Sequence, residues 1–198
     1  VEAAKDPDQQ DTRTLELYAQ PQSTVGRFTT ADDHLAMRKL LWERRLVEVG
    51  VRCVSVSFSD FDTHKNNFKR MRHMLPILDH GLNALVTDLR QRGMLDDVTV
   101  VVWGEFGRTP KINKNAGRDH WPGVGMAMFA GGGIKTGQVI GSTDRIAGTA
   151  VSRPVTYQDV LATVYHRLGI DARRTTILDP AGRPQYLLEN GEPIAEMI

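Results

Sequence analysis

The feature that most constrains this chain is a run of apolar residues that recur at alternating spacings of three and four. They are Phe68, Met71, Leu75, Leu78, Leu82, Leu85 and Leu89. This spacing places them on one face of a long α-helix, and Gly93 is a typical stop for such a helix. Pro76 lies within the run, so we expect a kink or a new helix start there. The pattern also fits a coiled coil, but the strand pattern that follows it favours a helix lying on a sheet.

Two further helices are predicted, one on each side of this run. Thr30 and Asp33 resemble a capping box, in which two side chains hydrogen-bond the free amides at the start of a helix. The apolar residues that follow fit a helix that ends at Gly50. A second helix is predicted to begin after Thr156, with Asp159 at its third position and a glycine as its stop.

Three segments have the pattern of β-strands. Residues 51–58 alternate between apolar and polar side chains, as in a strand with one buried face. Residues 98–103 are apolar apart from Thr99, and residues 124–130 are apolar and are followed by three glycines. Strands of this kind are covered on both faces, as in parallel sheets. With the helices, the order of elements predicts a doubly wound α/β fold with a mostly parallel sheet.

The two ends of the chain have weaker patterns. Residues 1–28 are rich in Asp, Gln, Thr and Pro and show no sustained period, so we expect a flexible polar lead-in with little core. Residues 29–198 are predicted to form a single α/β domain, for which the chain is long enough. The tail from Asp171 predicts loop structure with one short hairpin.

Composition excludes several classes of partner and site. Lys and Arg number 25 against 24 Asp and Glu, so the net charge is +1 and neither nucleic acid nor an anionic membrane surface is expected as a partner. No run of about 18 apolar residues is present, so no membrane span is expected. Cys53 is the only cysteine. An intramolecular disulfide and a cysteine zinc cluster are therefore excluded, and the apolar neighbours of Cys53 predict a buried thiol.

Three polar clusters lie next to the predicted strands. They are S-D-F-D-T-H after the first strand, G-E-F-G-R-T after the second, and G-R-D-H-W-P just before the third. Ligand-binding groups in parallel α/β sheets gather beyond the carboxyl ends of the strands, so the clusters are expected to meet at one edge. The candidate metal ligands that they supply are Asp62, His64, Glu105, Asp119 and His120.

This set of side chains points to a divalent metal. Three carboxylates and two imidazoles in one place need a cation to hold them together, and nitrogen with oxygen ligands suits zinc, manganese or iron better than calcium. Five ligands exceed the need of one tetrahedral zinc, which indicates two metals. Each residue also has a simpler interpretation: Asp62 in an Asx turn, Glu105 on the surface or paired with Arg108, and His120 packed on its neighbour Trp121.

Arg108 and Thr109 are the candidate catalytic residues beside these ligands. A guanidinium next to a metal is suited to hold two oxygens of a phosphate or sulfate group. The hydroxyl of Thr109 lies inside the metal motifs, as does that of Thr63. The alternative for Arg108 is a solvated loop residue.

Several long motifs, in order, resemble a known family. They include F-D-T-H-K-N-N-F, then L-D-D-V-T-V-V-V-W-G-E-F-G-R-T-P-K-I-N, then A-G-R-D-H-W-P and A-G-G-G-I-K-T-G-Q-V-I-G-S-T-D. Over roughly residues 35 to 180, the chain resembles the domain-of-unknown-function family 1501, within the alkaline phosphatase/sulfatase superfamily. The resemblance implies a three-layer α/β/α sandwich with a two-metal site for phosphate or sulfate esters of small molecules or saccharides. It also implies zinc, with manganese or calcium as alternatives, and a periplasmic or secreted location.

The resemblance also assigns roles by position. Asp62 and His64 resemble the first metal-binding group of the superfamily, Glu105 the second, and His120 with Asp119 the last. Asp60 stands where the family usually has a small residue. Nothing in the chain matches the amino-terminal half that carries the superfamily's nucleophile. Two interpretations therefore stay open: a hydrolase-type domain, and a metal- and oxyanion-binding domain without catalysis.

Overall fold

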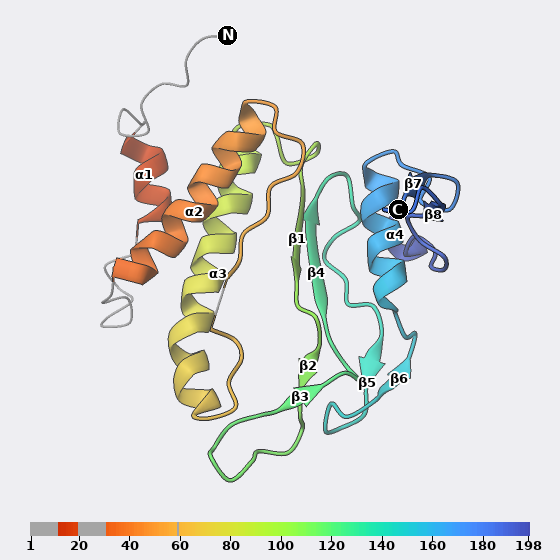
Figure 1. The fold of residues 1–198 in the computed structure, drawn as a ribbon. Coiled ribbons are helices and arrows are strands. Elements are labelled where there is room, and N and C mark those ends of the chain that lie inside the picture. The colour runs from red at the N-terminus through yellow and green to blue at the C-terminus, as the bar shows by residue number, and fades with distance from the viewer. Residues whose placement is uncertain (1–11, 20–30, 59) are drawn as a thin grey trace. The chain divides into compact units, whose positions relative to one another are not determined.

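The computed structural model describes residues 12–19, 31–58 and 60–198 (Figure 1). Contacts within the chain divide it into two compact units. The first unit comprises Val1–Met94 and Ile112–Arg118, and the second comprises Leu95–Lys111 and Asp119–Ile198. The chain therefore leaves the second unit after Lys111 and returns to it at Asp119. The described residues have a mixed α/β structure, as the sequence predicts.

The described part of the first unit consists of helices and the segments that join them. The helices are α1 (Thr12–Tyr18), α2 (Ala31–Glu48) and α3 (Asn67–Gln91). The predictions of the helices α2 and α3 are confirmed. Thr30 lies outside the described residues, so the capping box at the start of α2 stays a prediction. A new helix does not start at Pro76, because α3 runs through it, and the alternative expectation of a kink there stays a prediction. Pro76 has no N–H, so the helix lacks one hydrogen bond there. Ile77, the next residue, is 1% exposed, and its burial in the core holds this turn of the helix in place.

The helices α2 and α3 pack closely at a glycine. A Cβ atom built on Gly81 would lie 2.5 Å from Cδ1 of Leu40 and 2.7 Å from Cε of Met37. Both of these α2 side chains are buried, as are Ala84 and Leu89 on α3. The predicted apolar face is only partly buried: Leu85 and Leu89 lie in the core, but Phe68 and Leu75 are exposed, and Ile77, Gly81 and Ala84 complete the buried face of α3.

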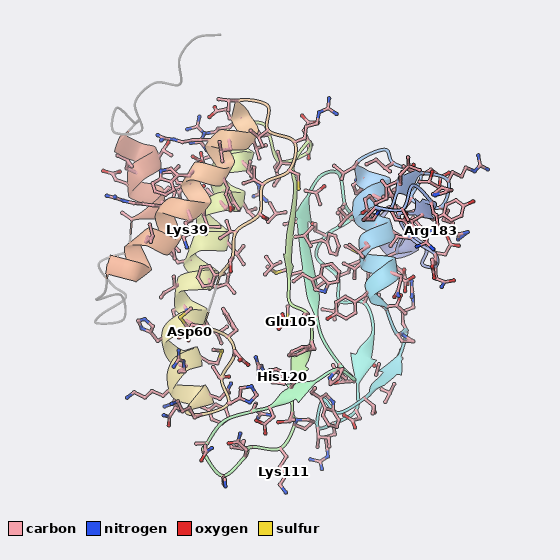
Figure 2. All side chains as sticks on the ribbon, in the orientation of Figure 1. Lys39, Asp60, Glu105, Lys111, His120 and Arg183 are labelled. Carbon is pink, nitrogen blue, oxygen red and sulfur yellow. The ribbon has the colours of Figure 1, made fainter. Side chains whose placement is uncertain are left out.

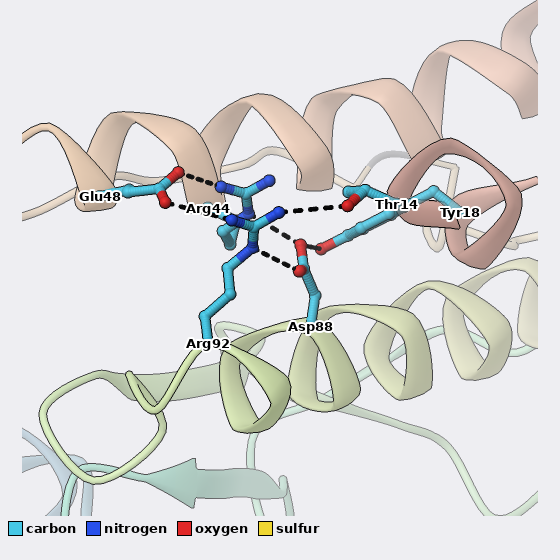
Figure 3. Close-up of polar contacts among 6 residues, drawn as sticks. All are labelled: Thr14, Tyr18, Arg44, Glu48, Asp88 and Arg92. Carbon is cyan, nitrogen blue, oxygen red and sulfur yellow. Dashed lines mark hydrogen bonds and ion pairs between the residues drawn. The ribbon is translucent and has the colours of Figure 1, made fainter. Parts of the chain in front are cut away.

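A buried polar network joins all three helices of the first unit (Figure 3). Its centre is Asp88 on α3, whose carboxylate accepts hydrogen bonds from Nε of Arg44 at 2.7 Å, Nε of Arg92 at 2.7 Å and the hydroxyl of Tyr18 at 3.3 Å. Both arginines also pair with Glu48. Burial, and then the neighbouring charge of Asp88, raise the pKa of Tyr18.

The first unit departs from three expectations. Residues 12–18 fall in the predicted lead-in, yet they form α1, and Tyr18 is only 4% exposed. The prediction of a strand at residues 51–58 is wrong, because no sheet among the described residues includes them. Val54 and Val56 are half-buried between exposed neighbours, as the alternation predicts, but a strand also needs a partner that completes its hydrogen bonds. Cys53, expected to be buried, is exposed.

The second unit contains paired strands and one long helix. β1 (Thr99–Trp103) pairs with β4 (Ala127–Gly131), and β2 (Gly107–Arg108) pairs with β3 (His120–Trp121). β5 (Ser142–Thr143) pairs with β6 (Ala150–Ser152), and β7 (Thr176–Leu178) forms a hairpin with β8 (Pro184–Tyr186). α4 (Tyr157–Arg167) and the short 3₁₀ helix η1 (Ala195–Met197) complete this unit. The predictions for β1, β4, α4 and the hairpin are confirmed.

The expected parallel sheet is not found among the described residues. Each of the four sheets has two strands, and each pair is antiparallel. The reason lies in the connection between β1 and β4. Residues 104–126 contain no helix, and a parallel pair needs a long crossover, usually a helix, whereas this segment turns back to pair the strands antiparallel.

The helix α4 is capped as the sequence predicts. The hydroxyl of Thr156 accepts a hydrogen bond from the N–H of Asp159, and the Asp159 carboxylate accepts one from the N–H of Thr156 at 2.8 Å. The core beside it is made of two small clusters, Ile134 with Ile194 and Met197, and Ala162 with Ala172 and Leu188. Within the described ranges, no helix combines the length and the hydrophobicity needed to cross a bilayer.

Candidate functional site

Asp62 and His64 lie on the turn that precedes α3 in the first unit. Nε2 of His64 is 3.1 Å from Oδ1 of Asp62, and the two side chains are 47% and 66% exposed, respectively. Thr63 between them is 1% exposed. The turn therefore points its two candidate ligands outward and anchors itself through the residue between them.

The turn is held by the segment 112–118 of the same unit. The carbonyl oxygen of Thr63 accepts a hydrogen bond from the N–H of Arg118 at 3.0 Å. Its hydroxyl accepts one from the side-chain amide of Asn67, the first residue of α3. The guanidinium carbon of Arg118 lies 5.6 Å from the ring centroid of Phe68, within the range of a cation–π contact. Backbone and side-chain contacts thus fix the turn on both sides.

Sequence reasoning did not single out Asn113 and Gly117, which also contact this turn. The side-chain amide of Asn113 donates to the carbonyl oxygen of His64 at 3.0 Å. A Cβ atom on Gly117 would lie 2.0 Å from the same oxygen, so only glycine fits there. The available signal was Asn113 followed four residues later by Gly117, the first residue of the third polar cluster, a pattern typical of an Asx-type loop.

Asp60, two residues before Asp62, has a backbone conformation that favours a small residue. Its φ angle is 79°, in the left-handed region where glycine has no steric penalty and where aspartate and asparagine are tolerated. Its carboxylate forms an ion pair with Arg70 on α3. This conformation explains why a small residue suits this position, and the ion pair is what the aspartate adds.

Glu105 lies just beyond β1 in the second unit (Figure 2). Its side chain is exposed. Burial, and then the negative charge of Glu105, raise the pKa of Tyr157, whose hydroxyl donates to the carbonyl oxygen of Gly104 at 3.0 Å. The ring of Tyr157 stacks on Trp103 with a centroid distance of 4.9 Å. These contacts fix the end of β1 against the start of α4, so the backbone next to Glu105 is held in place.

Arg108 and His120 are directly opposite each other on the β2–β3 ladder. The His120 ring is exposed and lies 4.3 Å from the Phe106 ring, measured between centroids. The guanidinium carbon of Arg108 lies 6.0 Å from the centroid of the same Phe106 ring. Phe106 therefore serves as a common packing surface for both candidate residues.

Thr109 and Asp119 continue the same ladder through hydrogen bonds. The N–H of Thr109 donates to the carbonyl oxygen of Asp119 at 2.9 Å, and the N–H of Asp119 donates to the Thr109 hydroxyl at 3.1 Å. That hydroxyl donates in turn to the carbonyl oxygen of Lys111 at 2.8 Å. The Thr109 side chain is thus engaged in holding the loop that carries Asp119.

The structure therefore brings the predicted site residues together in two sets. Asp62 and His64 form a pair in the first unit, while Arg108, Thr109, Asp119 and His120 share one ladder in the second, with Glu105 at the end of β1. The convergence of the two sets on one metal stays a prediction.

The chemistry and spacing of the first set fit a metal, and the spacing equally fits a direct hydrogen bond between the two side chains. Two atoms bonded to one zinc at about 2.0–2.1 Å, at a tetrahedral angle, lie roughly 3.3 Å apart. The 3.1 Å between Asp62 and His64 is close to that spacing. An imidazole nitrogen and a carboxylate oxygen are both ligands that zinc and manganese accept.

Comparison with known proteins adds a family to this description. No curated protein and no solved structure matches the chain significantly. A family model, in contrast, spans both units. The chain belongs to the family described as protein of unknown function (DUF1501), whose model matches residues 1–198.

Proposed function

We propose that this chain is a metal-dependent hydrolase-type domain for phosphate or sulfate esters, of the alkaline phosphatase/sulfatase type. The proposal includes the three-layer α/β/α architecture of that superfamily. The observation that carries it is the outward-facing pair of Asp62 and His64 at a metal-ligand spacing. The proposed ligands of one or two divalent cations are Asp62, His64, Glu105, Asp119 and His120.

The covalent chain supports a joint role for the two sets of residues. Arg118 is hydrogen-bonded to the turn that carries Asp62 and His64. Asp119, its neighbour in sequence, is hydrogen-bonded to Thr109 on the β2–β3 ladder. Consecutive Cα atoms are about 3.8 Å apart, so one peptide bond links the two hydrogen-bonded sets.

The proposed cation is zinc, with manganese or calcium as alternatives. Such a cation supplies charge that polarises the ester oxygens and stabilises the leaving group. The protein's own contribution is to bind and orient. Arg108 is suited to hold two oxygens of the phosphate or sulfate group, because a guanidinium presents paired N–H donors in a fixed plane. The proposed substrates are small-molecule or saccharide esters.

A second candidate is a domain that binds a metal and an oxyanion but does not cleave esters. Cleavage through a covalent intermediate needs a free hydroxyl or thiol beside the metal. The Thr109 hydroxyl donates to the Lys111 carbonyl and accepts from Asp119, and the buried Thr63 hydroxyl accepts from Asn67. These contacts engage both hydroxyls in the described part of the metal motifs and so favour the second candidate, and we expect little or no turnover of aryl esters by this chain.

An assay with aryl phosphates and aryl sulfates distinguishes the two candidates. The purified chain is tested with zinc, manganese and calcium in turn, beside Thr109→Ala, which removes the hydroxyl, and Thr109→Ser, which keeps it. Metal-dependent turnover that Thr109→Ser retains and Thr109→Ala loses assigns the nucleophile to Thr109. Metal binding without turnover in all three proteins supports the second candidate. A chain that binds no metal contradicts both.

A further inference from the structure

We infer that Asn113 is a positioning residue for the turn that carries Asp62 and His64, an inference that rests on the proposed metal-binding function. Asn113 belongs to residues 112–118, which we call the clasp loop. Its side-chain amide donates to the carbonyl oxygen of His64 at 3.0 Å, across 49 positions of sequence. The same side chain also organises the clasp loop itself.

The carbonyl end of the Asn113 side chain holds the clasp loop together. Its Oδ1 accepts hydrogen bonds from the N–H of Asn115 at 2.9 Å and the N–H of Gly117 at 2.9 Å. The backbone of Asn113 adds two more bonds, from its N–H to Gly117 and from Ala116 to its carbonyl oxygen. One carboxamide therefore shapes the loop with its oxygen and reaches the His64 turn with its nitrogen.

Backbone hydrogen bonds tie the clasp loop to the turn on both sides of His64. Before it, the carbonyl oxygen of Thr63 accepts from Arg118 at 3.0 Å. After it, the N–H of Asn66 donates to Asn115 at 3.1 Å, and the N–H of Asn67 donates to Ala116 at 2.9 Å. The last two bonds also satisfy amides at the start of α3 that the helix itself leaves unpaired.

Close packing removes the remaining freedom of the turn. A Cβ atom on Gly117 would lie 2.0 Å from the carbonyl oxygen of His64 and 2.4 Å from the N–H nitrogen of Lys65. The backbone of the clasp loop thus lies directly against the backbone of the turn. The side chains of Asp62 and His64 are 66% and 47% exposed. The backbone contacts hold the turn that carries them.

This arrangement predicts an effect of Asn113 on metal affinity. Ligands must be held within about 0.5 Å of a productive geometry, and the loss of supporting hydrogen bonds around a metal site typically lowers affinity 10–100-fold. Asn113→Ala removes both ends of the carboxamide. Asn113→Asp keeps an oxygen that can accept from Asn115 and Gly117 but loses the donor to His64. Asn115→Ala is a matched control, because Asn115 contributes to the clasp loop through its backbone.

The experiment is a zinc titration of the full chain by calorimetry, with the melting temperature of each metal-free variant measured in parallel. A salt concentration of about 0.5 M screens the charge added by the aspartate. We expect Asn113→Asp to bind zinc about tenfold more weakly than the wild type while its melting temperature stays close to that of the wild type. Asn113→Ala should lose both affinity and stability, and Asn115→Ala should match the wild type.

Two results would overturn the inference. One is unchanged zinc affinity in both Asn113 variants. The other is wild-type affinity in Asn113→Asp with losses only in Asn113→Ala, which would give the side chain a purely structural role in the clasp loop. If the wild type itself binds no zinc, the proposed function fails separately. Backbone amide exchange at residues 62–66 then tests the positioning role: faster exchange in Asn113→Asp supports it, and unchanged exchange contradicts it.

Discussion

Oδ1 of Asp62 and Nε2 of His64 lie 3.1 Å apart on a turn where both side chains face solvent. An exposed ion pair of this kind contributes about 0–1 kcal/mol to folding, so stability does not account for the pair. The geometry of the turn is instead set by backbone contacts with residues 112–118. Substitutions at the pair are therefore expected to change the stability of the fold little.

The first prediction separates binding from stability at this pair. Asp62→Asn and His64→Gln should each change the free energy of unfolding by less than about 1 kcal/mol, because the pair is exposed. Both should strongly weaken zinc binding, because each removes a proposed ligand. Chemical denaturation and zinc calorimetry measure the two effects. A large loss of stability with unchanged zinc affinity would give the pair a structural role.

The second prediction concerns the buried network around Asp88. Asp88→Ala leaves Arg44, itself buried, without its main partner, and such a loss costs about 3–5 kcal/mol. Glu192→Ala is the matched control, because Glu192 pairs with Arg173 on the surface, where an ion pair contributes about 0–1 kcal/mol. Urea denaturation measures both variants. Equal small effects would show that the Asp88 network does not hold the helices together.

The third prediction is a pH dependence that comes from Glu43 on α2. Burial raises the pKa of this carboxyl from 4.5 to about 7, because burial disfavours the charged form. The folded state therefore binds the proton more tightly than the unfolded state. The corresponding stability is fully present below pH 4.5 and is lost as the pH rises through 7.

Glu43→Gln tests this pH dependence. The free energy of unfolding of the wild type, minus that of the variant, should fall between pH 4.5 and 7 and then level off. Denaturation curves at several pH values measure this difference. A difference that does not change with pH would mean that Glu43 titrates normally in the folded state.

The fourth prediction concerns Gly117. Gly117→Ala would force a Cβ atom to within 2.0 Å of the His64 carbonyl oxygen, so the loop or the turn must move. Overpacking of this kind typically costs about 1–3 kcal/mol, and displacement of the turn should also weaken zinc binding. Gly104→Ala is the steric control, because a Cβ atom there meets nothing within 4 Å. Similar melting temperatures for both variants would contradict the close packing.

Local patterns predicted the elements of the fold better than their pairing. The spacing of apolar residues gave α3, and the hydroxyl and carboxylate at Thr156 and Asp159 gave the start of α4, because each signal lies within a few residues of the structure that it specifies. The direction of the β1–β4 pair depends on the path of residues 104–126, which a strand's own side chains do not encode. Helix α1 is joined to α3 by a hydrogen bond between Tyr18 and Asp88, which are 70 positions apart in the sequence. A contact over that separation leaves no local pattern in residues 12–18.

The candidate site shows the same division. Residue chemistry and order along the chain predict Asp62, His64 and His120 as candidate ligands, and their role as ligands stays a prediction. The supports of the turn were not predictable in this way, because Asn113 acts through a backbone oxygen 49 positions earlier and leaves no charge or periodicity in the sequence. The role of Gly117 comes from a close approach of two backbones, which only the folded chain reveals.

The central claim is that the chain binds a divalent metal through these residues, and a zinc titration of the metal-free chain tests it most directly. The melting temperature is followed at each step, and the zinc content is measured by elemental analysis after removal of unbound metal. We predict one or two zinc ions per chain and a melting temperature that rises with zinc and falls with chelator, because a ligand of the folded state stabilises it. His64→Ala and His120→Ala should lose this response, while His166→Ala, which changes an exposed histidine on α4, should keep it. Absence of bound zinc, with a melting temperature that neither zinc nor chelator changes, would contradict the claim.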